Sequence, residues 1–163
     1  MRNRSLVLVA ALLALGSPLA AQTTHPDFTG TWVLDATKTL TDGPLPAPSG
    51  ATQIVVQHGD SMTVDQKSSS EQGEMAMKKV WKVDGQAWAN AMTYQGTAMS
   101  LSSVLRWNGA ELVIRTTMDF SGTPVEQNES WTLAADGKTM TVTTTTNVNG
   151  AYYASVTMVF TRK

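Results

Sequence analysis

Residues 125–146 read VEQNESWTLAADGKTMTVTTTT, and this stretch decides the fold. Its apolar side chains stand two positions apart on both sides of a central Asp136-Gly137: Trp131 and Leu133, then Met140 and Val142. This alternation is typical of a β-strand with one face in a core and the other in water. Asp-Gly supplies the positive φ angles of a tight turn between antiparallel strands. The stretch therefore predicts a β-hairpin with both apolar runs facing inward.

The same pattern extends outward in both directions along the chain. Short runs rich in Thr, Val, Trp, Tyr and Met alternate with Gly-containing turns, and no long segment has a helical period. Between the first two strands, residues 36–51 contain three prolines and predict an irregular loop without a regular ladder. Residues 68–73 predict a mobile polar loop. We expect up to ten strands, at residues 29–35, 52–58, 61–68, 75–83, 86–92, 98–107, 111–120, 125–134, 138–147 and 152–161.

A meander of this many strands predicts an all-β fold, an antiparallel up-and-down β-barrel of 8–10 strands. An open sheet would leave two long edges unpaired, whereas a barrel closes them. A sandwich of two packed sheets is the main alternative.

The inward-facing residues divide between the two ends of this barrel. Parity also predicts that Ile54 and Val56 face the core. One end, which carries the Asp-Gly and Asn-Gly turns near residues 84, 108 and 136, receives all five tryptophans: Trp32, Trp81, Trp88, Trp107 and Trp131. Large rings in one layer predict that this end is filled and closed.

The other end receives flexible methionines and a few polar side chains, which predicts a ligand site. Methionine adapts to an apolar guest, and sparse polar groups fix its orientation. The alternative is that these side chains fill the barrel, because a barrel of about eight or more strands suits either outcome. Lys79 and Glu129 either pair with each other or hold a polar group of the ligand. The candidate ligand-binding residues are Gln66, Met75, Met77, Lys79, Met92, Met99, Thr116, Met118, Gln127, Glu129, Thr144 and Tyr152.

The composition argues against several classes of function. The chain has no cysteine, which removes thiolate catalysis and cysteine metal sites. The spacing of His25 and His58 does not predict a zinc site, so we expect no metal, no cofactor and no enzymatic activity. Cu(I) binding by methionine thioethers is a minor alternative. The chain is mildly acidic and its basic residues are scattered, which argues against nucleic-acid binding. The sequence contains no basic amphipathic helix of the kind that would indicate binding to a membrane surface.

The first 21 residues have the layout of a cleaved secretory signal peptide. Two basic residues, Arg2 and Arg4, precede an apolar run from Leu6 to Leu15, and small residues end the segment at Ala21. A run of this length is too short to span a bilayer, which takes about 20 apolar residues. We expect residues 1–21 to be removed and residues 22–163 to form a single exported domain, periplasmic or secreted.

Two parts of the chain carry a family likeness. Residues 27–34, DFTGTWVL, resemble the Gly-x-Trp opening of lipocalin-like proteins, and residues 130–142 and 159–162 look like bacterial exported lipocalin-like domains. The resemblance implies a calycin-type barrel that tends to bind small hydrophobic molecules. It also implies that Arg162 lies across Trp32 in a cation–π contact of about 0.5–2 kcal/mol, the alternative being a solvated terminal charge. The closed end then comprises Gly30, Trp32, Trp81, Trp107, Trp131 and Arg162.

The chain departs from the lipocalin pattern in its strand count. Ten strands are nearer to the fatty-acid-binding barrels than to the lipocalins, which have eight, yet residues 36–51 with three prolines cannot supply the helical pair that follows the first strand of those barrels. We expect an exported small-molecule binding protein that holds a small hydrophobic or amphipathic ligand in the open end. The alternative is a ligand-free barrel that acts as an interaction module through the loops at 36–51 and 68–74.

Overall fold

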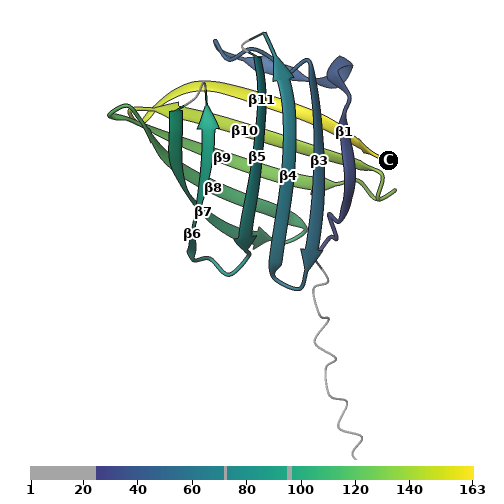
Figure 1. The fold of residues 1–163 in the computed structure, drawn as a ribbon. Coiled ribbons are helices and arrows are strands. Elements are labelled where there is room, and N and C mark those ends of the chain that lie inside the picture. Colours follow the sequence, from purple (N-terminus) through teal and green to yellow (C-terminus); the bar gives the residue numbers. More distant parts are fainter. Residues whose placement is uncertain (1–24, 72, 95–96) are drawn as a thin grey trace, which may run out of the picture.

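The computed structural model describes residues 25–71, 73–94 and 97–163, and these form an antiparallel β-barrel (Figure 1). The all-β barrel predicted from the sequence is confirmed, whereas the predicted signal peptide, residues 1–21, lies outside the described residues. The elements are β1 (Gly30–Leu34), the 3-10 helix η1 (Ala36–Lys38), β2 (Leu40–Asp42), β3 (Gly50–His58), β4 (Ser61–Ser70), β5 (Gly73–Lys82), β6 (Ala87–Tyr94), β7 (Thr97–Asn108), β8 (Glu111–Phe120), β9 (Thr123–Leu133), β10 (Thr139–Val148) and β11 (Ala151–Arg162).

Ten of these strands form the wall of the barrel in the order β5-β4-β3-β1-β11-β10-β9-β8-β7-β6. Most neighbours in space are neighbours in sequence, as in an up-and-down meander. The exception closes the barrel, because β1 pairs with β3 on one side and with β11 on the other. Trp32 lies opposite Gln53 of β3 and opposite Arg162 of β11, so the first strand joins the two ends of the meander.

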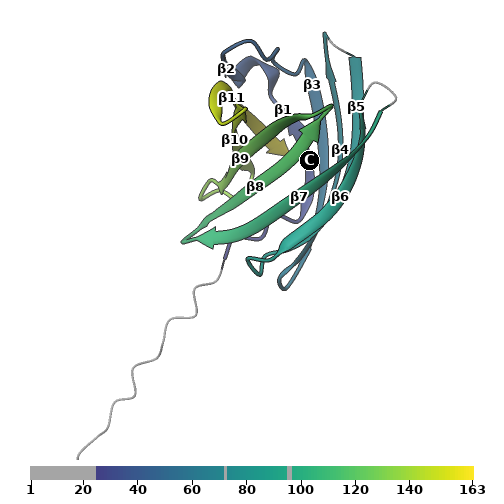
Figure 2. The same ribbon diagram turned by 90° about the vertical axis from the view of Figure 1, so that its left-hand side faces the viewer.

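The wall has one seam, between β5 and β6, where the described residues form no backbone ladder. The side chain of Asn90 on β6 takes the place of the ladder there. Its Oδ1 accepts a hydrogen bond from the Val80 amide at 2.8 Å, and its Nδ2 donates to the Val80 carbonyl oxygen at 3.3 Å. The two strands lie beside each other in Figure 2. The barrel is therefore nearly, but not fully, closed by backbone hydrogen bonds.

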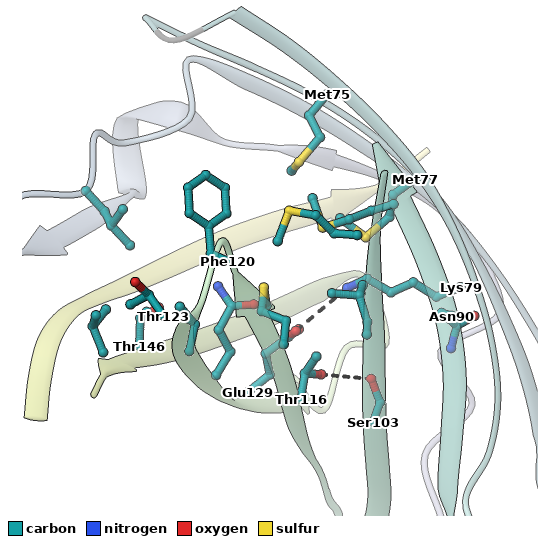
Figure 3. A pocket seen from close by; sticks show the side chains of 18 of the residues that line it. Met75, Met77, Lys79, Asn90, Ser103, Thr116, Phe120, Thr123, Glu129 and Thr146 are labelled. Atoms are coloured by element: carbon teal, nitrogen blue, oxygen red, sulfur yellow. Dashed lines mark hydrogen bonds and ion pairs between the residues drawn. The ribbon is translucent and has the colours of Figure 1, made fainter. Parts of the chain in front are cut away.

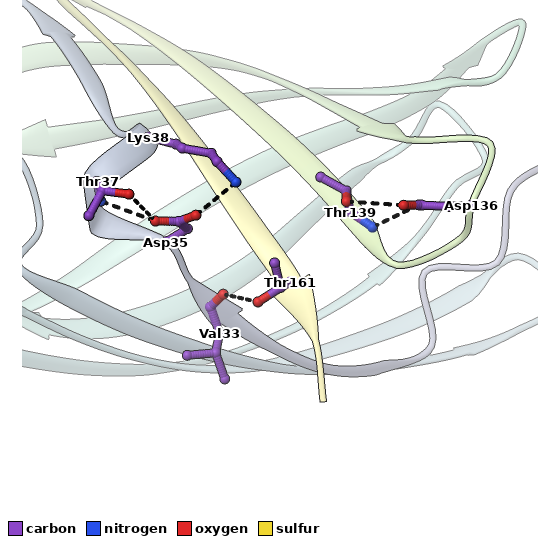
Figure 4. A network of polar contacts seen from close by, with 7 residues as sticks. All are labelled: Val33, Asp35, Thr37, Lys38, Asp136, Thr139 and Thr161. Atoms are coloured by element: carbon purple, nitrogen blue, oxygen red, sulfur yellow. Dashed lines mark hydrogen bonds and ion pairs between the residues drawn. The ribbon is translucent and has the colours of Figure 1, made fainter.

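The segment after β1 is more regular than the sequence suggested. Asp35 accepts hydrogen bonds from the amide and the hydroxyl of Thr37, at 3.2 and 2.6 Å, and pairs with Lys38 at 2.9 Å (Figure 4). These contacts stabilise η1, and β2 follows directly. The prediction that residues 36–51 form one irregular loop is wrong for its first part, because all three prolines come after Asp42.

Strand β2 extends the wall above β1, since β11 pairs with both strands in turn. Leu40 lies opposite Thr157, whereas β1 pairs with the later residues of β11. At the end of β2 the chain passes so close to β11 that a Cβ added to Gly43 would lie 2.5 Å from the Tyr153 carbonyl oxygen. Glycine is therefore required at this crossing.

The predicted loop at residues 68–73 is also mostly strand. Strand β4 continues to Ser70 and β5 begins at Gly73, and the serines of β4 pair with residues of β5, with Ser69 opposite Glu74. Serine side chains on both faces gave no apolar alternation there, although the backbone ladder continues.

The predicted inner face of β3 is wrong. Ile54 and Val56 are 49% and 54% exposed, whereas Gln53 and Val55 are 2% and 1% exposed. Residues 54–56 are all apolar, so their alternation does not show which side chains face inward. The polar side chain of Gln53 suggested that positions 53 and 55 face outward. The pairing with β1 determines which face of β3 lies inside, because Gln53 and Val55 lie opposite Trp32 and Gly30.

The closed end holds the core. Trp32, Trp81 and Trp131 are at most 1% exposed, and Trp88 and Trp107 pack around them, partly buried. The chain before β1 crosses this end and inserts the fully buried Phe28, whose ring lies 5.8 Å from Trp131. No helix among the described residues is both long and apolar enough to cross a membrane.

The first and last strands are joined around Trp32. The indole Nε1 donates to the Phe28 carbonyl oxygen at 2.8 Å, and the Arg162 guanidinium lies 4.6 Å from the ring centroid. Arg162 also donates to the Asp27 carbonyl oxygen at 3.2 Å. Its side chain passes over Gly30, where an added Cβ would lie 3.4 Å from Nε. The arginine is thus placed across the tryptophan, as the resemblance implies.

Candidate ligand cavity

The open half of the barrel encloses a cavity of about 580 Å³. Its upper wall is largely thioether and aliphatic surface, contributed by neighbouring strands and by Leu45 from the proline-rich loop. Side chains alternate in and out along each strand, so every second residue in the open half of β5 to β8 points into this space. The methionines that line it are Met75 and Met77 of β5, Met92 of β6, Met99 of β7 and Met118 of β8.

A smaller compartment of about 240 Å³ adjoins the main cavity beneath β3, β4, β10 and β11. The two spaces share Met77, Lys79 and Glu129 among their lining residues, so these side chains lie at the border between them. The smaller compartment adds polar side chains from the opposite wall, including Gln53, Gln66 and Thr144.

An ion pair forms the floor of the cavity. Lys79 Nζ lies 3.7 Å from Glu129 Oε1, and the two side chains are only 11% and 10% exposed. The ammonium also lies 5.1 Å from the centroid of the Trp81 ring, and Trp131 Nε1 donates to Glu129 Oε2 at 3.1 Å. Of the two possibilities that the sequence left open, pairing between Lys79 and Glu129 is therefore the one observed. Figure 3 shows the pair below Met75 and Met77.

A second polar contact lies on the same floor. The hydroxyls of Ser103 on β7 and Thr116 on β8 are 2.9 Å apart, and both residues are at most 5% exposed. Each hydroxyl can donate or accept a hydrogen bond, so this pair can also turn toward a polar group in the cavity. The floor thus separates the methionine-lined space from the tryptophan core.

The structure brings together eleven of the twelve predicted ligand-binding residues. Tyr152 is the exception, because it is 55% exposed and its hydroxyl donates to Asp42 at 2.6 Å. That hydrogen bond raises the pKa of Tyr152. The eleven residues that line the two compartments are Gln66, Met75, Met77, Lys79, Met92, Met99, Thr116, Met118, Gln127, Glu129 and Thr144.

A bulge explains the position of Tyr152. The register between β10 and β11 shifts between Thr146 and Asn147, so β11 carries one extra residue at this point. The extra residue reverses the parity, and Tyr153 lines the cavity instead. Bulges leave no reliable mark in the alternation of a single sequence.

Other lining residues lay outside the predicted inner faces. Leu45 stands between two prolines in a segment without periodicity, and Gln53 lies on the strand whose parity was assigned wrongly. Thr123 and Val148 lie at strand ends, where alternation stops. The residues missed in this way include Leu45, Gln53, Thr123, Val148 and Tyr153, together with Pro46, Pro48, Ala51 and the serines at 68–70 of the smaller compartment.

The two histidines lie outside the cavity lining. His25 stacks on Trp107, with ring centroids 4.4 Å apart, at the closed end. His58 is exposed at the end of β3. In the described parts of the chain, no three His, Cys, Asp or Glu side chains are grouped closely enough to hold a metal ion.

Comparison with known proteins finds solved structures of similar fold. No family model matches the sequence, and neither does any curated protein. Among solved structures, a secretory abundant heat-soluble protein of Ramazzottius varieornatus is similar, with a TM-score of 0.53 at 9% identity over 86% of this chain and 98% of that one. A zebrafish ileal bile acid-binding protein complexed with cholic acid has a TM-score of 0.50 at 14% identity over 83% and 98% of the two chains. At these identities the likeness shows the fold alone, an antiparallel and nearly closed β-barrel.

Proposed function

We propose that this protein is an exported binding protein that holds a small hydrophobic or amphipathic molecule in the open half of its barrel. The cavity of about 580 Å³ beneath the proline-rich loop carries the proposal. Small-molecule sites have volumes of about 300–1,000 Å³, apolar walls and a few polar groups that orient the ligand. Methionine walls above a polar floor meet that description.

The fold supports the same proposal. The zebrafish protein of similar fold was solved with cholic acid, an amphipathic molecule. A barrel of similar fold can therefore bind an amphipathic molecule. The alternative of a ligand-free interaction module would be favoured by side chains that fill the open half, and the cavity speaks against it.

We propose binding without catalysis. Lys79 and Glu129, the charged side chains of the described cavity lining, are engaged with each other and with the tryptophans below. A catalytic site needs a base or nucleophile that is within reach of a substrate and free to act.

Export is part of the proposal and rests on the sequence of residues 1–21. We expect a protein expressed with its complete N-terminus in a bacterial host to be recovered from the periplasm or medium with Gln22 as its first residue. Amino-terminal sequencing of the purified protein measures this. Recovery from the cytoplasm with residues 1–21 intact would contradict export and would leave ligand binding to be judged on its own test.

The binding test is a titration with the uncharged fluorophore N-phenyl-1-naphthylamine. We expect saturable binding at one site, with energy transfer from Trp81 and Trp131 to the probe because both rings lie under the cavity floor. Met77→Trp places a large ring inside the cavity and should weaken binding at least tenfold. Val56→Trp adds the same ring to the outer face of β3 and should leave the affinity unchanged. Absence of saturable binding, or equal loss in both variants, would contradict the proposal.

A further inference from the structure

The charges on the cavity floor are already balanced. Lys79 has Glu129 as its partner at 3.7 Å, and Glu129 also accepts a hydrogen bond from Trp131. Both side chains are nearly buried, so solvent screens them little. The lining residues of the two compartments include no further charged side chain in the described part of the chain. The interior is therefore neutral as a whole.

This balance affects ligands that carry a charge. A carboxylate that approached Lys79 would stand beside the carboxylate of Glu129, and one ammonium would then face two anions in a poorly solvated space. A charge that is buried without its own partner is strongly disfavoured. A ligand ammonium would meet Lys79 in the same way. An uncharged ligand leaves the pair intact.

A second observation, independent of the ion pair, indicates which uncharged group fits. Gln53 is 2% exposed and lines the smaller compartment. Its Oε1 is buried and receives no hydrogen bond from the residues that the structure describes. Buried acceptors are almost always paired, so this oxygen favours a ligand that offers a donor. An alcohol or amide donates a hydrogen bond, whereas an ionised carboxylate only accepts one.

We propose that the cavity selects uncharged amphipathic molecules whose polar end carries an O–H or N–H donor, and discriminates against carboxylates of the same chain length. The proposal rests on the proposed binding function and names its ligand class. The donor meets Gln53, the neutral headgroup leaves the Lys79–Glu129 pair undisturbed, and the apolar part lies among the methionines. The hydroxyls of Ser103 and Thr116 can accept or donate a further bond.

The test is displacement of N-phenyl-1-naphthylamine from the full chain at pH 8 by decan-1-ol and by decanoate. The two competitors share one chain length and differ in the charge and donor capacity of the polar end. We expect decan-1-ol to compete at least tenfold more strongly. Equal competition, or stronger competition by decanoate, would overturn the inference.

Three variants locate the cause of the selectivity. Glu129→Gln leaves Lys79 without its anion, so the affinity for decanoate should rise at least tenfold and the preference for the alcohol should shrink. Gln53→Leu removes the unpaired acceptor and should weaken decan-1-ol about threefold or more, with no loss for decanoate. Asp65→Asn makes the same change of charge on the outer face of β4 and should leave the affinities for both competitors unchanged. If the Glu129→Gln variant still binds the probe and its preference for decan-1-ol over decanoate is unaltered, the proposed role of the ion pair is overturned.

The outcomes separate this inference from the proposed function. If the parent protein shows no saturable probe binding, the binding function fails and the inference fails with it. If the probe binds and decanoate is preferred, the binding function stands and only the ligand class is wrong.

Discussion

The closed and open halves of the barrel are built by the same strands with the same alternation, yet one is solid and the other hollow. Strand β5 contributes Trp81 to the closed half and Met77 to the open half, and β9 contributes Trp131 and Gln127 in the same way. Topology therefore does not decide which half is filled. The side chains at matching positions decide it.

Ring geometry accounts for the filled half. Trp81 and Trp131 meet edge to face, with centroids 6.4 Å apart and planes at 75°, and Phe28 meets Trp131 at 83°. Flat rings at steep angles occupy the space between opposite walls. In the open half, unbranched methionines line the cavity, and the buried ion pair of Lys79 and Glu129 forms its floor. Rigid rings give stability, and flexible chains around polar groups leave room for a guest.

The difference between the filled and the hollow half predicts that truncation of a side chain lowers the free energy of unfolding more in the filled half. Trp32→Ala should lower the free energy of unfolding by about 3–5 kcal/mol, because a large buried ring is lost and the indole contacts with Phe28 and Arg162 go with it. Met77→Ala, which only enlarges an existing cavity, should cost less than about 2 kcal/mol. Urea denaturation measures both. Equal losses would break the distinction between a filled and a hollow half.

The seam predicts a smaller effect at the border of the hollow half. Asn90→Ala removes two hydrogen bonds to the backbone of Val80 and should lower the free energy of unfolding by about 1–2 kcal/mol. It should also speed hydrogen exchange of the Val80 amide, which loses its acceptor. Asn108→Ala, at the exposed end of β7, serves as the control and should not change the exchange rate of the Val80 amide. Unchanged exchange at Val80 in Asn90→Ala would mean that the side chain does not hold the seam.

The cation–π contact predicts a still smaller effect at the filled half. Arg162→Gln should lower the free energy of unfolding by about 0.5–1 kcal/mol, since the guanidinium lies over Trp32 at an exposed site. Tryptophan emission should shift in the same variant. The matched change Arg106→Gln, on the outer face of β7, should leave both quantities unaltered. Identical behaviour of the two variants would show that the arginine does not contribute through the ring.

The smallest effect is a pH dependence at the rim of the hollow half. The hydrogen bond to Asp42 raises the pKa of Tyr152 above the value of about 10 for a free tyrosine. A tyrosine whose pKa is raised in the folded state stabilises the fold fully at pH values below its unfolded-state pKa. This stabilisation is lost as the pH rises from the unfolded-state pKa through the folded-state pKa. The excess stability of the parent over Tyr152→Phe should therefore be constant up to about pH 9 and decrease as the pH rises above the unfolded-state pKa of about 10. Urea midpoints across this range measure it, and a pH-independent difference would exclude the contribution.

The architecture could be predicted because it depends on local signals. Alternation and Gly-containing turns mark the ten wall strands, and the tryptophans mark the closed end. Errors arose where alternation carried no information, as at Ile54-Val55-Val56, where pairing with β1 chose the face. The bulge that turns Tyr152 outward, and the loop that brings Leu45 over the cavity, depend on contacts between distant segments. The presence of a cavity depends on how side chains from opposite walls meet, which periodicity does not encode.

The pairing of β1 with β11 has a consequence for how the barrel is assembled. It joins Trp32 to Arg162, so the contact that closes the wall links the first strand of the barrel to the last one synthesised. Contacts between such distant residues carry a large loop-closure entropy and make folding slow. Without the 12 residues of β11, β1 and β10 have no partner on their facing edges, and the wall is interrupted there as well as at the seam between β5 and β6. The wall around the cavity therefore cannot close until β11 is in place.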